Sequence, residues 1–239
     1  MRISGIQKLT LLDYPGKTAA TVFTPGCNLR CPFCQNHDLV LGRKAEDGTR
    51  YFPLVPEEEL FALLDKRAGL LDGVCITGGE PLLQPDLTEF CRDIHARGFL
   101  VKLDTNGTLP GRLERLLATG YVDYVALDIK NAPARYAETS GMDAISTEGI
   151  GASLIVIANS GVPYECRTTV TRELHTKDDL RTIARHLHSV PAWYLQQYRD
   201  SEGVIAGSGI FHAWPPEELE ALLPELQRLC PAAQIRNPD

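Results

Sequence analysis

Three cysteines, Cys27, Cys31 and Cys34, lie within eight residues near the start of the chain. Pro25 and Gly26 come directly before this stretch and Pro32 lies within it, so it can continue neither as a helix nor as a paired strand and must form a loop. Thiolates on such a loop can converge on one metal centre. Three of them supply one ligand fewer than structural zinc sites and most iron–sulfur clusters use. The spacing therefore predicts a metal centre with one open coordination position.

Two kinds of metal site fit this loop. A zinc site would take His37 or a distant cysteine as its fourth ligand. An iron–sulfur cluster would instead leave one iron free to bind a small molecule. The other four cysteines are scattered outside the loop, and we expect them to be buried thiols rather than ligands; they are Cys75, Cys91, Cys166 and Cys230.

Composition indicates an ordinary globular protein. With 239 residues, 44% of them hydrophobic, the chain is long enough for one large domain or two small ones. We expect a single domain, with its core over about residues 18–200 and a C-terminal helical extension over 201–239. No apolar run reaches the ~18 residues of a membrane span, and the N-terminus has no signal-peptide core, so we expect a cytoplasmic protein without a membrane partner. The net charge of −7 without a basic cluster argues against nucleic-acid binding.

Strand and helix patterns alternate along most of the chain. Strands are predicted over residues 18–23, 74–77, 100–103, 124–127, 164–170 and 192–197. Between them, Asp86 is expected to cap a helix, a helix is expected over 144–159, and Thr176 with Asp179 forms a capping box. The last helix, over 216–229, should kink or split at Pro224. The alternation predicts an α/β fold with a parallel sheet, although periodicity alone does not decide whether the sheet closes.

Polar groups follow these strands in succession. The cysteine loop follows the first strand, and Thr77-Gly-Gly-Glu-Pro81 follows the second. Asp104-Thr-Asn-Gly107 follows the third strand and Asp128-Ile-Lys130 the fourth. Arg167 lies on the fifth, and Gln196-Gln197-Tyr198 ends the sixth. Because ligands of parallel sheets bind at the carboxyl ends of strands, these groups are expected to share one site.

Each motif has a chemical and a structural interpretation. Gly78 and Gly79 would let backbone approach a ligand and leave the Glu80 carboxylate facing an amine or cation, or they could form a plain turn. Asp104 and Asp128 are costly to bury unless a cation or several donors share the site, although either could simply cap a turn. Several polar strand ends in succession favour a shared site, whereas a zinc site explains only the first.

An arginine on the fifth strand also needs a partner. Arg167 shares one face of its strand with Glu165 and Thr169, and would project toward the inside of the barrel. The other face carries Cys166, Thr168 and Val170. Its guanidinium could bind a carboxylate of a ligand, or of Glu165 or Asp128.

Together these motifs, with Asp13-Tyr-Pro-Gly-Lys17 before them, resemble the glycyl-radical-enzyme activating branch of the radical S-adenosylmethionine (SAM) superfamily. The likeness runs from about residue 5 to residue 200. Within the branch, the sequence is most similar to activating proteins of anaerobic ribonucleoside-triphosphate reductase. The resemblance implies a parallel partial (β/α)6 barrel of the radical SAM type.

The resemblance implies a [4Fe-4S] cluster on Cys27, Cys31 and Cys34, with SAM chelating the fourth iron. An external one-electron donor such as flavodoxin or ferredoxin would reduce the cluster, which would pass an electron to the SAM sulfonium and release methionine and a 5′-deoxyadenosyl radical. In this branch the radical removes a hydrogen atom from a glycine of a large partner glycyl radical enzyme.

The resemblance also implies which residues bind SAM. They are Phe33, Gln35, Asn36, Gly78, Gly79, Glu80, Asp104, Thr105, Asn106, Asp128, Lys130, Arg167 and Gln196. By similarity to pyruvate formate-lyase activating enzyme, Asp104, Thr105 and Asp128, with the carbonyl of Leu127, would hold a monovalent cation. The sixth strand departs from that relative, which has a histidine near the ribose where this chain has Gln196 or Gln197.

Three functions remain open at this point. The first is activation of a glycyl radical enzyme, with anaerobic ribonucleoside-triphosphate reductase preferred. The second is radical SAM chemistry on another substrate: a pyruvate formate-lyase-like partner, a small molecule, a peptide or an RNA. The third is a non-catalytic zinc-binding adaptor.

Overall fold

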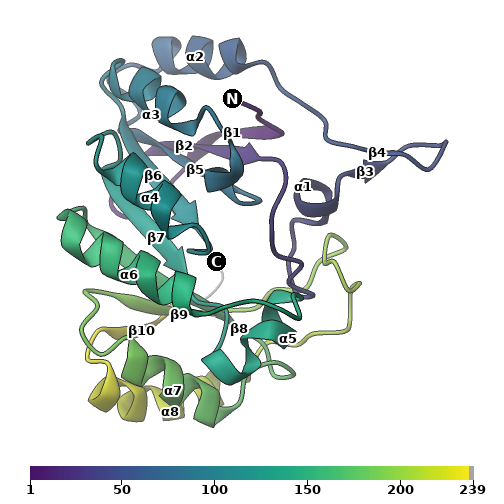
Figure 1. Cartoon of the computed structure of the whole chain (residues 1–239), viewed down its shortest axis with the longest axis vertical. Helices are drawn as coiled ribbons and strands as arrows, with labels where there is room; N and C mark the ends of the chain where they lie inside the picture. The colour runs from purple at the N-terminus through teal and green to yellow at the C-terminus, as the bar shows by residue number, and fades with distance from the viewer. Residues whose placement is uncertain (237–239) are drawn as a thin grey trace.

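The computed structural model describes residues 1–236. Its centre is an eight-stranded sheet whose strands lie in the order β1-β2-β5-β6-β7-β8-β9-β10 (Figure 1). The strands are β1 (Gly5–Thr10), β2 (Ala19–Thr24), β5 (Gly73–Gly78), β6 (Leu100–Thr105), β7 (Tyr124–Asp128), β8 (Tyr164–Val170), β9 (Trp193–Gln197) and β10 (Ala233–Arg236). All neighbouring pairs are parallel except β1 with β2. Because β1 and β10 are opposite edges of this sheet, the barrel is open.

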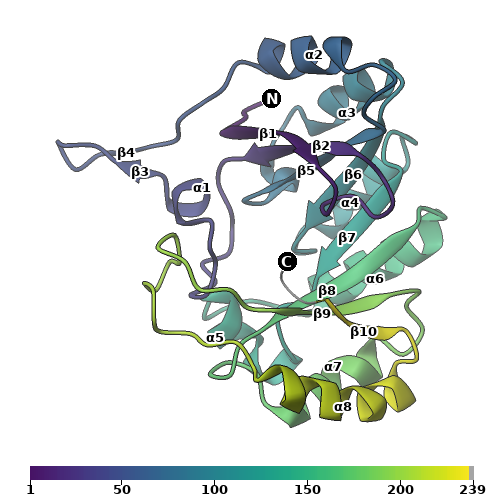
Figure 2. The same cartoon turned by 180° about the vertical axis from the view of Figure 1, so that it is seen from behind.

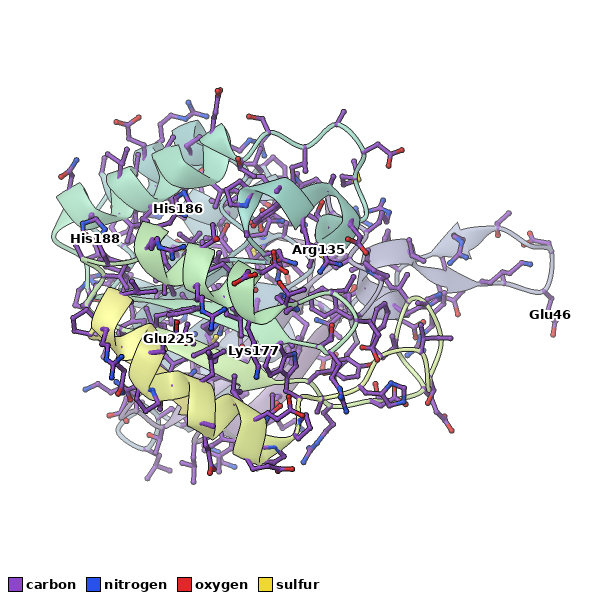
Figure 3. The ribbon with its side chains drawn as sticks, turned by 90° about the horizontal axis from the view of Figure 1, so that it is seen from below. Glu46, Arg135, Lys177, His186, His188 and Glu225 are labelled. Carbon is purple, nitrogen blue, oxygen red and sulfur yellow. The ribbon has the colours of Figure 1, made fainter. Side chains whose placement is uncertain are left out.

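Helices connect the strands and cover the outer side of the curved sheet (Figures 1 and 2). They are α1 (His37–Leu41), α2 (Glu57–Lys66), α3 (Leu87–His95), α4 (Pro110–Leu117), α5 (Tyr136–Ser140), α6 (Glu148–Ser160), α7 (Lys177–His186) and α8 (Pro216–Leu229), with 3-10 turns η1 (Pro81–Leu83) and η2 (Pro133–Arg135). A two-stranded hairpin, β3 (Arg43–Lys44) and β4 (Arg50–Tyr51), projects from the body with Glu46 near its tip (Figure 3).

Strand β6 shows how the sequence separates the two faces of the sheet. Val101 and Leu103 are fully buried in the main apolar core, which includes the inner faces of the helices. Lys102 and Asp104 alternate with them, so they lie on the opposite, inner face of the sheet. The apolar core therefore lies between sheet and helices, and the polar side chains gather inside the open barrel.

The structure confirms the predicted alternation and the partial barrel. All six predicted strands are present, and they are the six central strands of the sheet. The capping box of Thr176 and Asp179 at the start of α7 is also present. Where the strand boundaries differ from the predicted ones, they differ by one or two residues, because strands end where ladder pairing ends rather than where β-branched residues end.

Several local predictions were wrong. Strands β1 and β10 and helix α5 were not predicted, and the extension predicted as helical carries β10 after α8; residues 237–239 of that extension lie outside the described residues. Helix α8 is not split, since it runs from Pro216 to Leu229 through Pro224, and Leu219, Leu222 and Leu226 are buried on its apolar face. Asp86 makes no capping hydrogen bond, since its carboxylate lies 2.8 Å from the Met1 amino nitrogen.

Three further predictions concern membrane-spanning helices, the remaining cysteines and the helix over 144–159. No helix within residues 1–236 is long and apolar enough to cross a bilayer. The four cysteines outside the loop are fully buried and unpaired, as predicted. The predicted helix over 144–159 begins later, at Glu148.

Candidate active site

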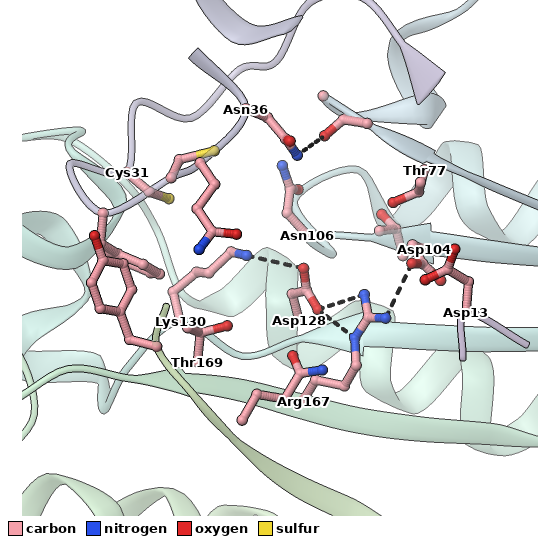
Figure 4. A pocket seen from close by; sticks show the side chains of 18 of the residues that line it. Asp13, Cys31, Asn36, Thr77, Asp104, Asn106, Asp128, Lys130, Arg167 and Thr169 are labelled. Atoms are coloured by element: carbon pink, nitrogen blue, oxygen red, sulfur yellow. Dashed lines mark hydrogen bonds and ion pairs between the residues drawn. The ribbon is translucent and has the colours of Figure 1, made fainter. Parts of the chain in front are cut away.

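A cavity of about 730 Å³ lies inside the open barrel, at the carboxyl ends of its strands. Residues of strands β5 to β10 and of the loops that follow β1, β2 and several later strands form its walls, so residues far apart in the sequence meet here (Figure 4). The strand-end motifs named from the sequence are therefore brought to one place, as parallel topology requires.

The cysteine loop, residues 25–36, forms one wall of the cavity. Cys27, Cys31 and Cys34 all line it. Inside the loop, the Cys34 N–H donates to the Cys31 carbonyl (3.0 Å) and the Leu29 N–H approaches the Cys27 sulfur (3.4 Å). Burial raises the pKa of all three thiols, that of Cys31 to about 12. The metal-free loop therefore holds neutral thiols, and a metal must displace their protons.

The motif predicted that Glu80 faces a ligand, but the structure places Glu80 outside the cavity lining. Its side chain is fully buried and does not line the cavity. The carboxylate accepts hydrogen bonds from the Thr105 hydroxyl (2.8 Å), the Asn106 N–H (2.8 Å) and the Leu82 N–H (3.1 Å). Burial raises the pKa of Glu80 to about 7. Glu80 thus ties the end of β5 to the end of β6, while Gly78 and Gly79 present backbone to the cavity.

Two aspartates and an arginine form a bridge across three strands. Arg167 on β8 donates to Asp104 on β6 (3.1 Å) and to Asp128 on β7 (2.9 Å), as Figure 4 shows. Lys102 takes the other oxygen of Asp104, and Lys130 lies 3.0 Å from the other oxygen of Asp128. Every carboxylate oxygen of the pair therefore contacts a cationic side chain of the chain itself.

These charges determine one another's protonation. Burial alone would raise the pKa of Asp128, but Arg167 and Lys130 hold it well below its usual range. Burial would likewise lower the pKa of Lys130, and Asp128 instead raises it. Asp104, Asp128, Lys130 and Arg167 are thus ionised at neutral pH. With the two lysines, Lys102 and Lys130, counted as part of the bridge, three cations face two carboxylates, which leaves one formal positive charge within the bridge.

The remaining residues predicted to bind SAM also reach the cavity. Phe33, Gln35 and Asn36 line it, and the Asn36 amide donates to the Gly78 carbonyl (3.2 Å). The Asn106 amide lies 3.8 Å from the Cys27 sulfur. Gln196 lines the cavity as well; in register with Thr169, it shares the inner face of the sheet.

Sequence reasoning missed several residues that position this site. His175 Nε2 lies 2.8 Å from the Lys130 carbonyl, and the Tyr136 hydroxyl accepts from the Lys130 N–H. Arg236 on β10 forms a two-pronged pair with Glu165 and lines the cavity. A signal existed only for Lys102, a lone lysine within the apolar run Leu100–Leu103. His37, by contrast, pairs with Asp38 (3.2 Å) and is absent from the cavity lining.

The comparison with protein families agrees with this geometry. The family model described as the radical SAM superfamily matches residues 21–187, which include the cysteine loop and seven of the eight helices found within residues 1–236. The chain belongs to the radical SAM superfamily.

Two curated relatives of this radical SAM enzyme are similar over most of their length. A Methanocaldococcus jannaschii protein named as a candidate glycyl-radical enzyme activating enzyme is 33% identical over 204 residues, 84% of this chain and 81% of the relative. A pyruvate formate-lyase-activating enzyme of Clostridium pasteurianum is 31% identical over 205 residues, 79% of this chain and 77% of the relative. Among solved structures, the crystal structure of Streptococcus suis SuiB bound to S-adenosylmethionine aligns with 92% of this chain and 52% of the SuiB chain, with a TM-score of 0.66. Because the two sequences are 14% identical, this likeness concerns the fold alone.

Membership of the radical SAM superfamily implies an iron–sulfur cluster and SAM, and the donor set fits both. Residues 1–236 contain no group of three or more His, Cys, Asp or Glu side chains placed to hold one metal ion. Ligands of a multi-iron cluster lie farther apart than those of a single zinc ion, so three thiols around one cavity fit a cluster better than zinc. The same cavity offers glycine backbone and the positive charge of the bridge to a zwitterionic ligand.

We expect Arg167→Gln to destabilise the metal-free protein by about 1–3 kcal/mol, because one oxygen of Asp104 and one of Asp128 lose their charged hydrogen-bond partner, while Lys102 and Lys130 still pair with the other two oxygens. Chemical denaturation measures this change. Arg181→Gln is the control. Arg181 pairs with Asp178 and Glu225 at the surface, so this substitution should leave the denaturant midpoint of unfolding almost unchanged. An Arg167→Gln protein as stable as wild type would show that the bridge does not hold the strands.

We expect stability to fall as pH drops below about 6.5, in part through His175. Its Nδ1 accepts from the Thr171 N–H (3.2 Å), which fixes the neutral ring, and burial lowers its pKa below the ordinary 6.5. Since the unfolded state then binds the proton more readily, stability present at neutral pH is lost as pH falls through the folded pKa. His175→Gln keeps a donor and an acceptor but does not titrate. Between about pH 7 and pH 5 the variant should therefore lose less unfolding free energy than wild type; equal losses would exclude this role.

Proposed function

We propose that this chain is an activating enzyme for a glycyl radical enzyme, and that its partner is anaerobic ribonucleoside-triphosphate reductase. In this proposal Cys27, Cys31 and Cys34 hold a [4Fe-4S] cluster whose remaining iron binds SAM. The observation that carries the proposal is the three-thiol wall beside a positively charged bridge in one cavity. Two relatives of the activating type, each similar over more than three quarters of both chains, support the choice of reaction.

When bound, the cluster and SAM supply one-electron cleavage of the sulfonium and removal of a hydrogen atom from a C–H bond. The residues of the chain bind and orient. Lys130 and Arg167 would hold the carboxylate of SAM, because the bridge carries one positive charge more than its two aspartates match. Gly78 and Gly79 offer backbone groups to its ammonium. Glu80 acts indirectly, because its carboxylate accepts a hydrogen bond from the Asn106 N–H and so positions the loop of Asn106.

The resemblance also implies a monovalent cation at Asp104, Thr105 and Asp128, but the side chains of the chain already use the oxygens that it would need. The Thr105 hydroxyl donates to Glu80, and the oxygens of Asp104 and Asp128 already contact lysine or arginine. A cation would therefore have to displace one of these contacts. In the structure as it stands, the charge of the two aspartates is balanced by side chains.

The mouth of the cavity is suited to a protein substrate. Leu11 and Leu12 line the cavity and yet are 68% and 66% exposed. Exposed leucines side by side are unusual on a surface that meets only water, and apolar side chains of this kind favour contact with another polypeptide. We propose that the glycine-bearing segment of the partner enters past these leucines.

The setting of the reaction follows from its chemistry. A one-electron donor, such as flavodoxin or ferredoxin, must reduce the cluster. The seven cysteines are unpaired in the structure, which suits a reducing cytoplasm. The net charge of −7 argues against nucleic acid as a substrate.

Anaerobic assay with a purified anaerobic ribonucleoside-triphosphate reductase tests the proposal. The reconstituted enzyme, given SAM and dithionite, should generate a glycyl radical in the reductase, detected by electron paramagnetic resonance, with one methionine released per activation. Cys31→Ala should abolish the signal. The control is the enzyme without the reductase, which should form 5′-deoxyadenosine slowly.

Two results would contradict the proposal. Rapid cleavage of SAM without any glycyl radical in the reductase would mean that the substrate is a different one. A radical formed equally well by Cys31→Ala would mean that the cluster is not its source.

A further inference from the structure

The segment that follows β9, residues 199–211, lies against the cysteine loop. In Figures 1 and 2 it runs beside the chain that leads from β2 to α1. Backbone hydrogen bonds join the two segments: the Ile205 N–H donates to the Cys34 carbonyl (3.0 Å) and the Ala206 N–H to the Pro32 carbonyl (2.9 Å). In return, the His37 N–H donates to the Gly203 carbonyl (3.2 Å). The backbone around the last two cysteines is thus paired to a distant part of the chain.

A small apolar cluster, separate from the main core, joins the same two segments. Cys31 and Phe33 of the cysteine loop pack with Val204 and Phe211 of the later segment. The Phe33 and Phe211 rings meet edge to face with their centroids 6.4 Å apart. Removing this contact would expose apolar surface directly beside a cysteine that is predicted to bind the cluster.

Glycines mark where backbone touches the cysteine loop. A Cβ atom on Gly203 would lie 2.7 Å from the Gln35 carbonyl oxygen, which is closer than side chains tolerate. Gly79 and Gly141 leave just as little room against the carbonyls of Gly26 and Arg30. The loop is therefore held at its start, middle and end, by elements that follow β5, β7 and β9.

The segment over residues 199–211 has its own internal support. The Asp200 carboxylate accepts hydrogen bonds from the Tyr198 hydroxyl (2.9 Å), the Ser208 hydroxyl (2.6 Å) and the Gly209 N–H (2.8 Å). These bonds close the segment on itself without any contribution from the cysteines. It can therefore act as a fixed surface on which the cysteine loop is ordered.

We propose that residues 199–211 are a strap that holds the cysteine loop in its cluster-binding conformation before metal is present, and that Gly203 is the residue that positions it. The strap thereby shields the cluster from solvent on the side of Cys31 and Cys34. The inference rests on cluster binding by the cysteine loop, and is independent of which substrate the enzyme activates.

Gly203→Ala tests the strap without straining the backbone, because the φ angle of Gly203 lies outside the left-handed region. In the metal-free full-length protein, hydrogen exchange should show loss of protection at Ile205, Ala206 and Cys34. After reconstitution, a chelator should remove iron about tenfold faster than from wild type, the scale typical of residues that support metal ligands. The reduction potential of the cluster should also shift, as greater solvent exposure requires.

Gly151→Ala is the matched control. Gly151 lies on α6 with open space around the position of a Cβ atom, so the same chemical change should alter none of these readings. If Gly203→Ala does not fold, Phe211→Leu replaces it and is read by the same criteria. A folded variant with wild-type protection, iron release and potential overturns the proposal. Because no partner enzyme is used, failure here is distinct from failure of glycyl radical formation.

Discussion

The site depends on a guanidinium shared by two aspartates, of which Asp104 is buried and Asp128 is half-buried. Arg167 reaches from β8 to Asp128 on the neighbouring strand and to Asp104 on the strand beyond it. Buried charges are tolerated only when each is paired and hydrogen-bonded, so the three groups must stay together. This requirement fixes the relative positions of three strand ends in the middle of an open sheet, where barrel closure is not available to fix them.

The other functional parts are arranged around that bridge. Lys130 extends it toward the thiols, and the carbonyl of Lys130 is in turn held by His175. Glu80 fastens the neighbouring pair of strand ends through neutral donors, where a hydroxyl and two N–H groups take the place of cations. The contrast explains why burial raises the pKa of Glu80, whereas Asp104 and Asp128 keep theirs low. A ligand with a carboxylate thus meets a wall that is already organised and carries positive charge.

Local patterns in the sequence predicted the strands, the cysteine loop and the edge of the sheet where the site lies. These patterns are contained in a few consecutive residues: Val101 and Leu103 alternate with polar neighbours, which indicates a strand, and three thiols lie among prolines, which indicates a metal-binding loop. The choice of partners could not be predicted in this way. Arg167 binds residues 39 and 63 positions away, and Glu80 binds residues 25 and 26 positions away. Such pairs form because the topology of the sheet brings the strand ends together. From the sequence, each of these residues had several acceptable partners, so the actual pairs could not be predicted.

The same reason explains what was missed at the C-terminal side. Strand β10 is a four-residue segment, Ala-Gln-Ile-Arg, with no alternation long enough to predict a strand, and it forms because β9 offers a free edge. Residues 199–211 are polar and rich in glycine, a composition typical of an unstructured connection. Their contacts with the cysteine loop depend on Gly203 and Phe211, which become informative only when the loop lies beside them.

The central claim is that three thiols leave one iron free for SAM. The most direct measurement is the electron paramagnetic resonance spectrum of the reduced, reconstituted protein before and after SAM is added. The account predicts a four-iron cluster whose signal changes shape when SAM binds. A spectrum that SAM leaves unchanged, or a colourless protein that retains zinc, would contradict it.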